Sequence, residues 1–225
     1  MRKVSIEVSS GVVDGIFAVP DEGTGPGVLV IQEWWGLVPH IADVVARFAD
    51  AGFTALAVDH YRGRQTTEPD EAQKLMMGLD IGQVSDDLAH AAQWLHDRDE
   101  VAGAAIGTVG FCMGGGLALL APTVSDIITG AVAFYPAMPW PDFAPDWSRY
   151  RGKEALIHKA ESDEERTGPV ISDYARQIEA NGGVASLIEY PGSVHAFFND
   201  ARPHVFQEQH AHLAWEYTLA FLRAD

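Results

Sequence analysis

The chain has 225 residues, of which 47% are hydrophobic and 21% charged, a composition typical of a folded globular protein. It carries 15 basic and 32 acidic residues, giving a net charge of −17. Nucleic acids and anionic membranes attract positively charged proteins, so we expect neither as a partner. The length suits one hydrophobic core, and we expect residues 1–225 to form a single domain.

The N-terminal segment predicts no secretion signal, because Arg2 and Lys3 are not followed by an apolar run. No stretch reaches the roughly 18 apolar residues that a membrane span needs. Cys112 is the only cysteine, which excludes an internal disulfide and agrees with a reducing compartment. We therefore expect a cytoplasmic protein.

Short apolar segments alternate with helical patterns along the chain. Segments 4–8 and 12–19 alternate like an antiparallel hairpin with a turn near Ser10. Further strands are expected at 27–33, 54–59, 107–110, 130–135, 155–159 and 186–190. Six strands that alternate with helices predict an α/β fold, in which a mostly parallel sheet of about eight strands carries helices on both faces.

The helices between these strands are predicted from apolar positions spaced three and four residues apart. They are expected at 41–48, at 88–95 with Ser85 as the N-cap, at 114–121 and at 171–181. A C-terminal helix is expected to bury one face, made of Leu213, Tyr217, Ala220 and Phe221. The segment 136–150 is rich in proline and tryptophan and has no periodicity, which indicates a loop.

The most informative motif is Gly110-Phe-Cys112-Met-Gly114, between a predicted strand and a predicted helix. It is the thiol version of the G-x-S-x-G nucleophile elbow, a sharp strand-to-helix turn that needs small flanking residues. A lone cysteine is usually a small buried hydrophobe, but this context favours Cys112 as a nucleophile.

His195 is the best candidate for the base that takes the proton of the thiol. In sheets of this kind, ligands and catalytic residues gather beyond the carboxyl ends of the strands. His195 lies in a loop shortly after the last predicted strand, and His60 is the only rival. His158 lies inside a strand and is expected to be a packed core residue. The spacing of His204, His210 and His212 splays ligands apart on a helix, so we expect no metal.

An acidic run that follows the strand 155–159 supplies the third member of a triad. Asp163 precedes His195 in the chain, as the order nucleophile, acid, histidine of α/β-hydrolases requires. Glu161 competes with Asp163 for this role, whereas Glu164 and Glu165 are expected to be solvated.

Glu33 ends an apolar central strand, where a carboxylate is costly unless it has a task. In this layout the loop after that strand supplies one amide of the oxyanion hole, and the residue after the nucleophile supplies the other. The backbone N–H groups of Trp34 and Met113 are therefore the predicted oxyanion hole.

These residues resemble the dienelactone hydrolase family of α/β-hydrolases, over nearly the whole chain. The resemblance rests on Gln32-Glu33 with Gly36, Asp59-His-Tyr61, Gly110–Gly115, the segment from His158 to Asp163, and His195-Ala-Phe197. It implies an α/β-hydrolase fold and a triad of Cys112, His195 and Asp163. It also implies that Glu33 holds the resting thiol and releases it when substrate arrives. We expect no cofactor.

The predicted substrate pocket departs from the family pattern at one position. Family members that act on dienelactone bind its carboxylate with arginines, one of them shortly after the catalytic histidine. Asn199 stands at that position here, and the segment after Tyr61 is short. Arg62 and Arg64 could supply positive charge, although exposed loop arginines are more often only solvated.

Aromatic side chains complete the expected pocket. Trp35, Arg62, Phe197 and Asn199 are its predicted lining residues. Trp140, Phe143 and Trp147 either roof the pocket or cover the edges of the core, and the sequence does not distinguish these two roles.

The sequence thus predicts a cysteine hydrolase of small-molecule carboxylic esters or lactones, as a monomer or small homo-oligomer. Two alternatives remain open at this stage. One is a binding protein that keeps the pocket without turnover. The other is a thiol redox protein, although the chain has no second cysteine to resolve a sulfenic acid.

Overall fold

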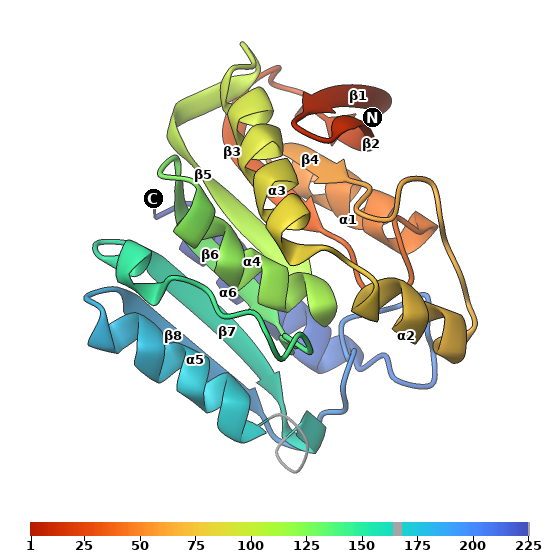
Figure 1. Ribbon diagram of the computed structural model, residues 1–225, viewed down its shortest axis with the longest axis vertical. Helices are drawn as coiled ribbons and strands as arrows, with labels where there is room; N and C mark the ends of the chain where they lie inside the picture. The colour runs from red at the N-terminus through yellow and green to blue at the C-terminus, as the bar shows by residue number, and fades with distance from the viewer. Residues whose placement is uncertain (164–167, 225) are drawn as a thin grey trace.

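A computed structural model describes residues 1–163 and 168–224. Its eight strands form one sheet in the order β1-β2-β4-β3-β5-β6-β7-β8 (Figure 1). All neighbours from β4 to β8 are parallel, whereas β2 is antiparallel to both β1 and β4. The strands are β1 (Arg2–Val8), β2 (Gly11–Ala18), β3 (Gly25–Ile31), β4 (Thr54–Val58), β5 (Val101–Phe111), β6 (Ile128–Phe134), β7 (Glu154–Ala160) and β8 (Val184–Tyr190).

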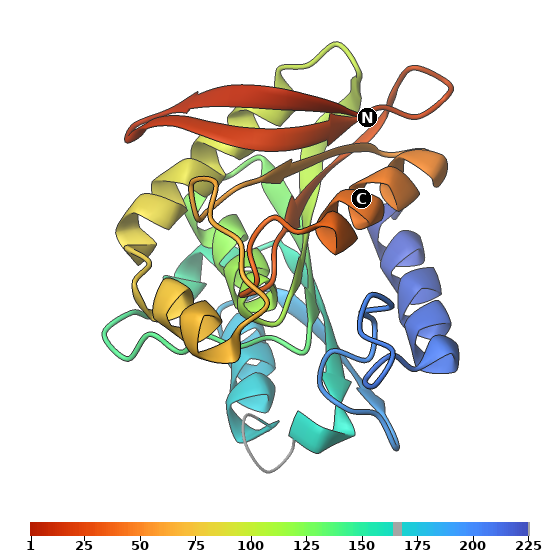
Figure 2. The same cartoon turned by 90° about the vertical axis from the view of Figure 1, so that its right-hand side faces the viewer.

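Helices cover both faces of the sheet, with α1 and α6 on one face and α3, α4 and α5 on the other (Figure 2). They are α1 (Pro39–Asp50), α2 (Pro69–Met77), α3 (Ile81–His96), α4 (Met113–Val124), α5 (Gly168–Ala180) and α6 (Glu208–Leu222). This architecture confirms the predicted α/β fold. Within the described residues, no helix is both long and apolar enough to cross a bilayer.

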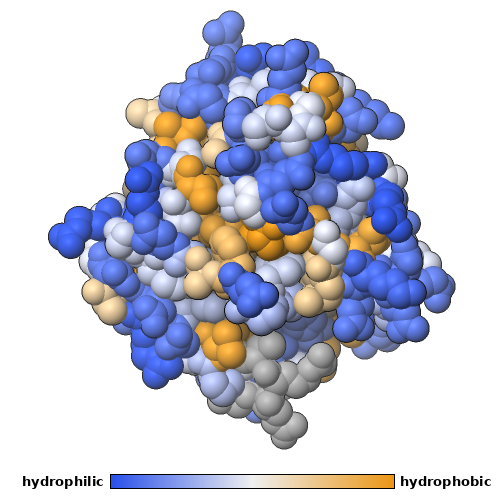
Figure 3. All heavy atoms as spheres, viewed as in Figure 1, coloured by the Kyte–Doolittle hydropathy of each residue, from blue (hydrophilic) through white to orange (hydrophobic). Residues whose placement is uncertain are grey.

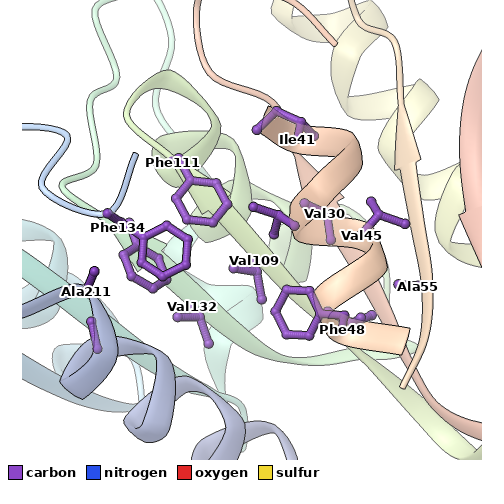
Figure 4. Packing of buried hydrophobic residues seen from close by; sticks show 14 of the residues in the cluster. Val30, Ile41, Val45, Phe48, Ala55, Val109, Phe111, Val132, Phe134 and Ala211 are labelled. Carbon is purple, nitrogen blue, oxygen red and sulfur yellow. The ribbon is translucent and has the colours of Figure 1, made fainter. Parts of the chain in front are cut away.

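The hydrophobic core lies between the central strands and the helices on each face. Figure 4 shows Ile41 and Phe48 of α1 beside Val30 of β3 and Val109 of β5, all buried. The face of the molecule in Figure 3 is mostly hydrophilic, with hydrophobic residues in small groups. Burial on both faces explains why β3 to β6 are continuous apolar runs rather than alternating ones.

Two local predictions about the helices are wrong or incomplete. Ser85 is not the N-cap of α3, because Asp80 accepts a hydrogen bond from the backbone N–H of Gln83 at 3.1 Å and caps the helix one turn earlier. Ser85 lies inside the helix and donates to the carbonyl of Ile81. The helix α2 was not predicted, because only Ala72 and Leu75 of it are buried.

The buried face of α6 is also not the predicted one. Leu213 and Tyr217 are 39% and 42% exposed, whereas Ala211, Ala214 and Thr218 are buried. Leu222 is also buried, so the face that meets the core is rotated around the helix from the predicted one. The hydroxyl of Thr218 also lies 3.1 Å from Nε2 of the buried His158.

His158 is a packed core residue, as expected from its place within a strand. It is fully buried, and its Nδ1 lies 2.8 Å from the hydroxyl of Tyr190. Burial lowers the pKa of His158 to about 3. Burial, helped by the charge of Arg62, lowers the pKa of His60 to about 4.

These two histidines predict a loss of stability in acid. In the folded state both rings stay neutral down to about pH 4 and 3, whereas in the unfolded state each has its ordinary pKa of about 6.5. Below pH 6.5 the unfolded state therefore binds more protons than the folded state, which favours unfolding. Their contribution is therefore complete above pH 6.5 and is lost as the pH falls toward 4 and 3. Each group contributes a slope of at most about 1.4 kcal/mol per pH unit. Urea unfolding of wild type and H158Q between pH 7 and 4 should give a shallower decline for the variant, and equal slopes would contradict this assignment.

Candidate active site

Cys112 occupies a sharp turn between the end of β5 and the start of α4. Its backbone has φ 55° and ψ −117°, a region that residues other than glycine rarely adopt. The turn is fixed by hydrogen bonds from Cys112 N–H to the carbonyl of Phe134 at 3.0 Å, and from Ala137 N–H to the carbonyl of Cys112 at 3.0 Å. The thiol is partly buried at the N-terminus of α4, beyond the carboxyl end of the central strand β5.

The glycines that flank Cys112 are required by the close approach of strand and helix. A Cβ on Gly110 would collide with the carbonyl oxygen of Gly114. A Cβ on Gly114 would collide with the carbonyl oxygen of Gln32, at the end of β3. The first turn of α4 therefore lies directly against the segment that carries Glu33.

Substitution of Gly114 by alanine tests this packing. We expect G114A to lose about 1–3 kcal/mol of unfolding free energy, because the methyl group meets backbone oxygens that cannot rotate away. Gly82→Ala is the matched control. Gly82 lies in the first turn of α3, where its Cβ would meet only a side-chain oxygen of the N-cap Asp80, at 3.3 Å. Alanine is also a better helix former than glycine. Urea unfolding should show no comparable loss in G82A, and an equal loss in both variants would contradict the packing argument.

The structure brings His195 and Asp163 together. Nδ1 of His195 lies 2.8 Å from Oδ1 of Asp163, and the backbone N–H of His195 donates to the hydroxyl of Ser162 at 2.8 Å. Glu161 is turned elsewhere, because its carboxylate accepts the backbone N–H of Gly192. The geometry therefore favours Asp163 over Glu161. Glu164 and Glu165 lie outside the described residues.

The imidazole of His195 is held between an acid and a thiol. Burial opposes its protonation, but the hydrogen bond to Asp163 and the influence of Cys112 raise the pKa of His195 to about 10. A carboxylate can only accept hydrogen bonds, so Nδ1 carries a proton and Nε2 is the nitrogen available to Cys112. A carboxylate that orients an imidazole is the pairing that the predicted base requires.

Glu33 lies just beyond β3 and is only 1% exposed. Its Oε2 accepts a hydrogen bond of 2.8 Å from Nδ2 of Asn199, which is 2% exposed. Among the described residues, Oε1 of Glu33 has no hydrogen-bond partner. The hydrogen-bond partner of Glu33 is thus Asn199, the residue at which this sequence departs from the family pattern.

Tyr135 is a site residue that the sequence analysis missed. It follows β6 directly, has a positive φ of 39°, and its ring centroid lies 4.9 Å from that of His195. Burial and the charges of Glu33 and Cys112 raise the pKa of Tyr135 well above its usual value. Its place at the carboxyl end of a parallel strand was the available signal.

The two amides predicted for the oxyanion hole lie in the loop after β3 and at the start of α4. Trp34 follows Glu33, and Met113 is the first residue of α4. In the described part of the chain, neither amide donates to a backbone carbonyl. The N–H of Met113 belongs to the first helical turn, whose amides have no partner within the helix.

A cavity of 860 Å³ is formed by residues of the segments 35–40, 65–69 and 199–204. Cys112, His195 and Glu33 do not line it, and it is joined to them through Asn199, which contacts Glu33. Of the residues predicted to line a substrate pocket, Trp35 and Asn199 line this cavity. Phe197 does not, because it is fully buried against the rings of Tyr135 and Tyr190. Arg202 and His40 are lining residues that the sequence analysis did not nominate.

A profile of the Dienelactone hydrolase family matches residues 13–225 of the chain. The chain belongs to the dienelactone hydrolase family. It is 32% identical over 229 residues to "Protein usf" of Aquifex pyrophilus, covering 99% of this chain and 97% of the relative. It is 28% identical over 239 residues to "Putative carboxymethylenebutenolidase" of Aquifex aeolicus (strain VF5), with the same coverage.

The fold of this family is also found among solved structures. The crystal structure of "Putative Dienelactone Hydrolase from Klebsiella pneumoniae subsp. pneumoniae MGH 78578" matches with a TM-score of 0.88 and 24% sequence identity. The match covers 99% of this chain and 97% of that one, and it shows a shared fold. The family match makes the chain a dienelactone hydrolase-like hydrolase.

The arginines considered for substrate binding in this dienelactone hydrolase family member are engaged elsewhere. The guanidinium of Arg62 lies 2.6 Å from the buried carboxylate of Asp87 and also donates to the hydroxyl of Ser10. Arg64 pairs with Glu71 on the surface at 2.6 Å. Neither arginine lines the cavity, so the expectation that Arg62 contacts substrate does not agree with its placement.

The aromatic residues of the loop 136–150 pack on the core. Trp140 is 7% exposed and donates its ring N–H to the carbonyl of Met76 at 2.9 Å. Trp147 lies against the rings of Tyr150 and Tyr174. Phe143 packs beside Trp140 on the cluster beneath α3 and α4. The structure thus favours the core-covering role over a roof for the pocket.

No metal centre is visible in the geometry of residues 1–163 and 168–224. Within these ranges, no three His, Cys, Asp or Glu side chains are grouped as a metal site requires.

Proposed function

We propose that residues 1–225 form a single-domain hydrolase of carboxylic esters or lactones, with Cys112 as its nucleophile, His195 as its base and Asp163 as the orienting acid. Two observations carry the proposal: the strained turn that holds Cys112 between β5 and α4, and the 2.8 Å bond between His195 and Asp163. Family membership supports the same reaction class.

The first half of the reaction forms an acyl-enzyme. When substrate enters, the proton of Cys112 lies on Nε2 of His195, an ion pair that the raised pKa of His195 favours, and the sulfur attacks the carbonyl carbon of the substrate. The carbonyl oxygen becomes an oxyanion, which accepts hydrogen bonds from the amides of Trp34 and Met113. As the tetrahedral intermediate collapses, the C–O bond breaks and His195 returns its proton to the leaving alkoxide.

The second half releases the acid. His195, neutral again, takes a proton from water, whose oxygen attacks the thioester carbonyl. The C–S bond breaks, the acid leaves, and Cys112 regains the proton from His195. Asp163 keeps Nδ1–H in place throughout, so that Nε2 always faces the reacting atoms.

Glu33 acts on the resting enzyme in this proposal. Its buried carboxylate accepts the hydrogen of the resting thiol and releases it when substrate enters. The support is its burial, its free Oε1, and the packing of its segment against the first turn of α4.

The substrate is proposed to be a small-molecule ester or lactone, in keeping with the carboxymethylenebutenolidase named among the relatives. A cytoplasmic location, and a monomer or small homo-oligomer, remain predictions.

Intact-mass spectrometry tests the covalent step. After rapid quenching of the enzyme with p-nitrophenyl acetate, the protein mass should rise by one acetyl group. Peptide mapping should place that group on Cys112, the only cysteine. An acetyl group on a serine, or turnover without any protein adduct in the burst phase, would count against a cysteine nucleophile.

A further inference from the structure

Glu33 is a buried carboxylate without a cationic partner. Among the described residues it forms no ion pair, and its one hydrogen bond comes from the neutral amide of Asn199. A buried charge is normally paired, so this arrangement is costly and unusual. The segment that carries Glu33 is pressed against the first turn of α4, so the uncompensated charge lies close to Cys112.

Asn199 is itself held rigidly. Its N–H donates to the carbonyl of Ala196 at 2.9 Å, and its carbonyl accepts the N–H of Arg202 at 3.1 Å. The next residue, Asp200, is fixed to α1 by Nδ1 of His40 at 3.1 Å and by the guanidinium of Arg47. The loop therefore presents the amide of Asn199 to Glu33 in one defined position.

The orientation of that amide follows from elementary hydrogen-bond chemistry. A carboxylate only accepts, so Nδ2 of Asn199 must face Glu33 and Oδ1 must point away. Among the described residues Oδ1 has no partner, and Asn199 lines the cavity. At this end of the cavity the wall thus offers an acceptor oxygen and no donor from Asn199, and the buried carboxylate of Glu33 lies directly behind that amide.

We propose that Asn199 is a positioning and specificity-determining residue, which holds Glu33 as an uncompensated carboxylate beside Cys112 and so selects esters or lactones without an anionic group at this end of the cavity. The inference rests on the proposed function for its substrate class. An anionic group would meet like charge in a desolvated site, which disfavours binding strongly. The same charge repels negative charge that develops on the sulfur of Cys112, so the reactivity of this sulfur reports it.

Arg202 is the group that could oppose this selection. It lines the cavity, and its guanidinium lies 5.4 Å from the ring centroid of Trp35. Its charge is directed over that ring, and its other polar contact is His204 at 3.5 Å. Arg202 is therefore the position to compare with Asn199, since it also lines the cavity and its charge has the opposite sign to that of Glu33.

The specificity test compares p-nitrophenyl butanoate with p-nitrophenyl hemisuccinate, which replaces the terminal methyl group by a carboxylate. Wild type should favour butanoate by at least about tenfold in kcat/KM. N199R should reduce or invert this ratio, because it neutralises Glu33, whereas N199Q should keep it. R202M should increase the preference for butanoate, because it removes a cation that lines the cavity. A wild-type preference for hemisuccinate that is lost in R202M would overturn the proposal.

Thiol alkylation by iodoacetamide gives a second readout that does not need ester turnover. At pH 7 the rate at Cys112 should increase in N199R, stay near wild type in N199Q and decrease in N199D, each by several fold. Equal rates in all variants would mean that Asn199 only supports the loop, and would overturn the proposal. If no ester is hydrolysed, the proposed function fails while the order of alkylation rates still decides the role of Asn199. Should N199R not fold, N199D and N199Q decide it.

Discussion

Replacing Cys112 with alanine should lower kcat for p-nitrophenyl butanoate by about 10⁵-fold, to the level of the uncatalysed reaction in a binding site. The expected loss is large because attack by sulfur is the only covalent step available at the turn between β5 and α4. The variant should fold normally, since a smaller side chain at a partly buried position leaves the glycine contacts intact. Stopped-flow and steady-state kinetics measure the loss, and unfolding by urea checks the fold.

Two controls separate chemistry from structure in this experiment. C112S keeps a nucleophilic atom of similar size, and we expect it to remain far below wild type because a hydroxyl is a much weaker acid than a thiol. Iodoacetamide should inactivate wild type with one equivalent of label, because the chain has one cysteine. Full activity in C112A would exclude the cysteine mechanism, and would point to a different nucleophile on the same fold.

Replacing Asp163 with asparagine should lower kcat by about 10⁴-fold, which is the second largest effect. The amide of asparagine can donate to Nδ1 of His195, which stabilises the tautomer with its proton on the wrong nitrogen. The hydrogen bond to Asp163 also helps to raise the pKa of His195, so D163N should lower the pH at which this ring titrates. Titration by NMR of the histidine ring protons measures that shift.

Glu161 offers a matched control two residues away. Its carboxylate accepts the N–H of Gly192 rather than a proton of His195. E161Q keeps an acceptor oxygen for that amide, so we expect its kcat within about tenfold of wild type. A loss in E161Q as large as that in D163N would mean that the two carboxylates exchange roles in solution, and the assignment of Asp163 would then be wrong.

Strand pattern, turn chemistry and chain order were sufficient for much of the fold. Continuous apolar runs predicted the buried parallel strands, because burial on both faces removes any need for alternation. The errors occurred where packing overrides pattern. In α6 the buried face consists of Ala211, Ala214, Thr218 and Leu222, and a pattern of large apolar residues did not reveal which side of the helix meets the core.

Some residues of the candidate site could likewise be predicted from the sequence, whereas others could not. Cys112 is visible in the sequence because a strained turn between β5 and α4 demands glycine on both sides, and that demand is local. The order of Cys112, Asp163 and His195 is likewise a property of the chain. The sequence does not decide between Asp163 and Glu161, because both residues follow the same strand. The short turn at 161–163 determines which of the two carboxylates faces His195.

Local sequence determined that this chain builds a parallel sheet with a cysteine at its elbow and a carboxylate at the end of the neighbouring strand. Tertiary structure alone decided what surrounds that carboxylate. Glu33 and Asn199 are 166 positions apart, and no local rule relates them. Their contact exists because β3 and the loop after β8 end at the same edge of the sheet, where long-range packing brings together groups that the sequence keeps separate.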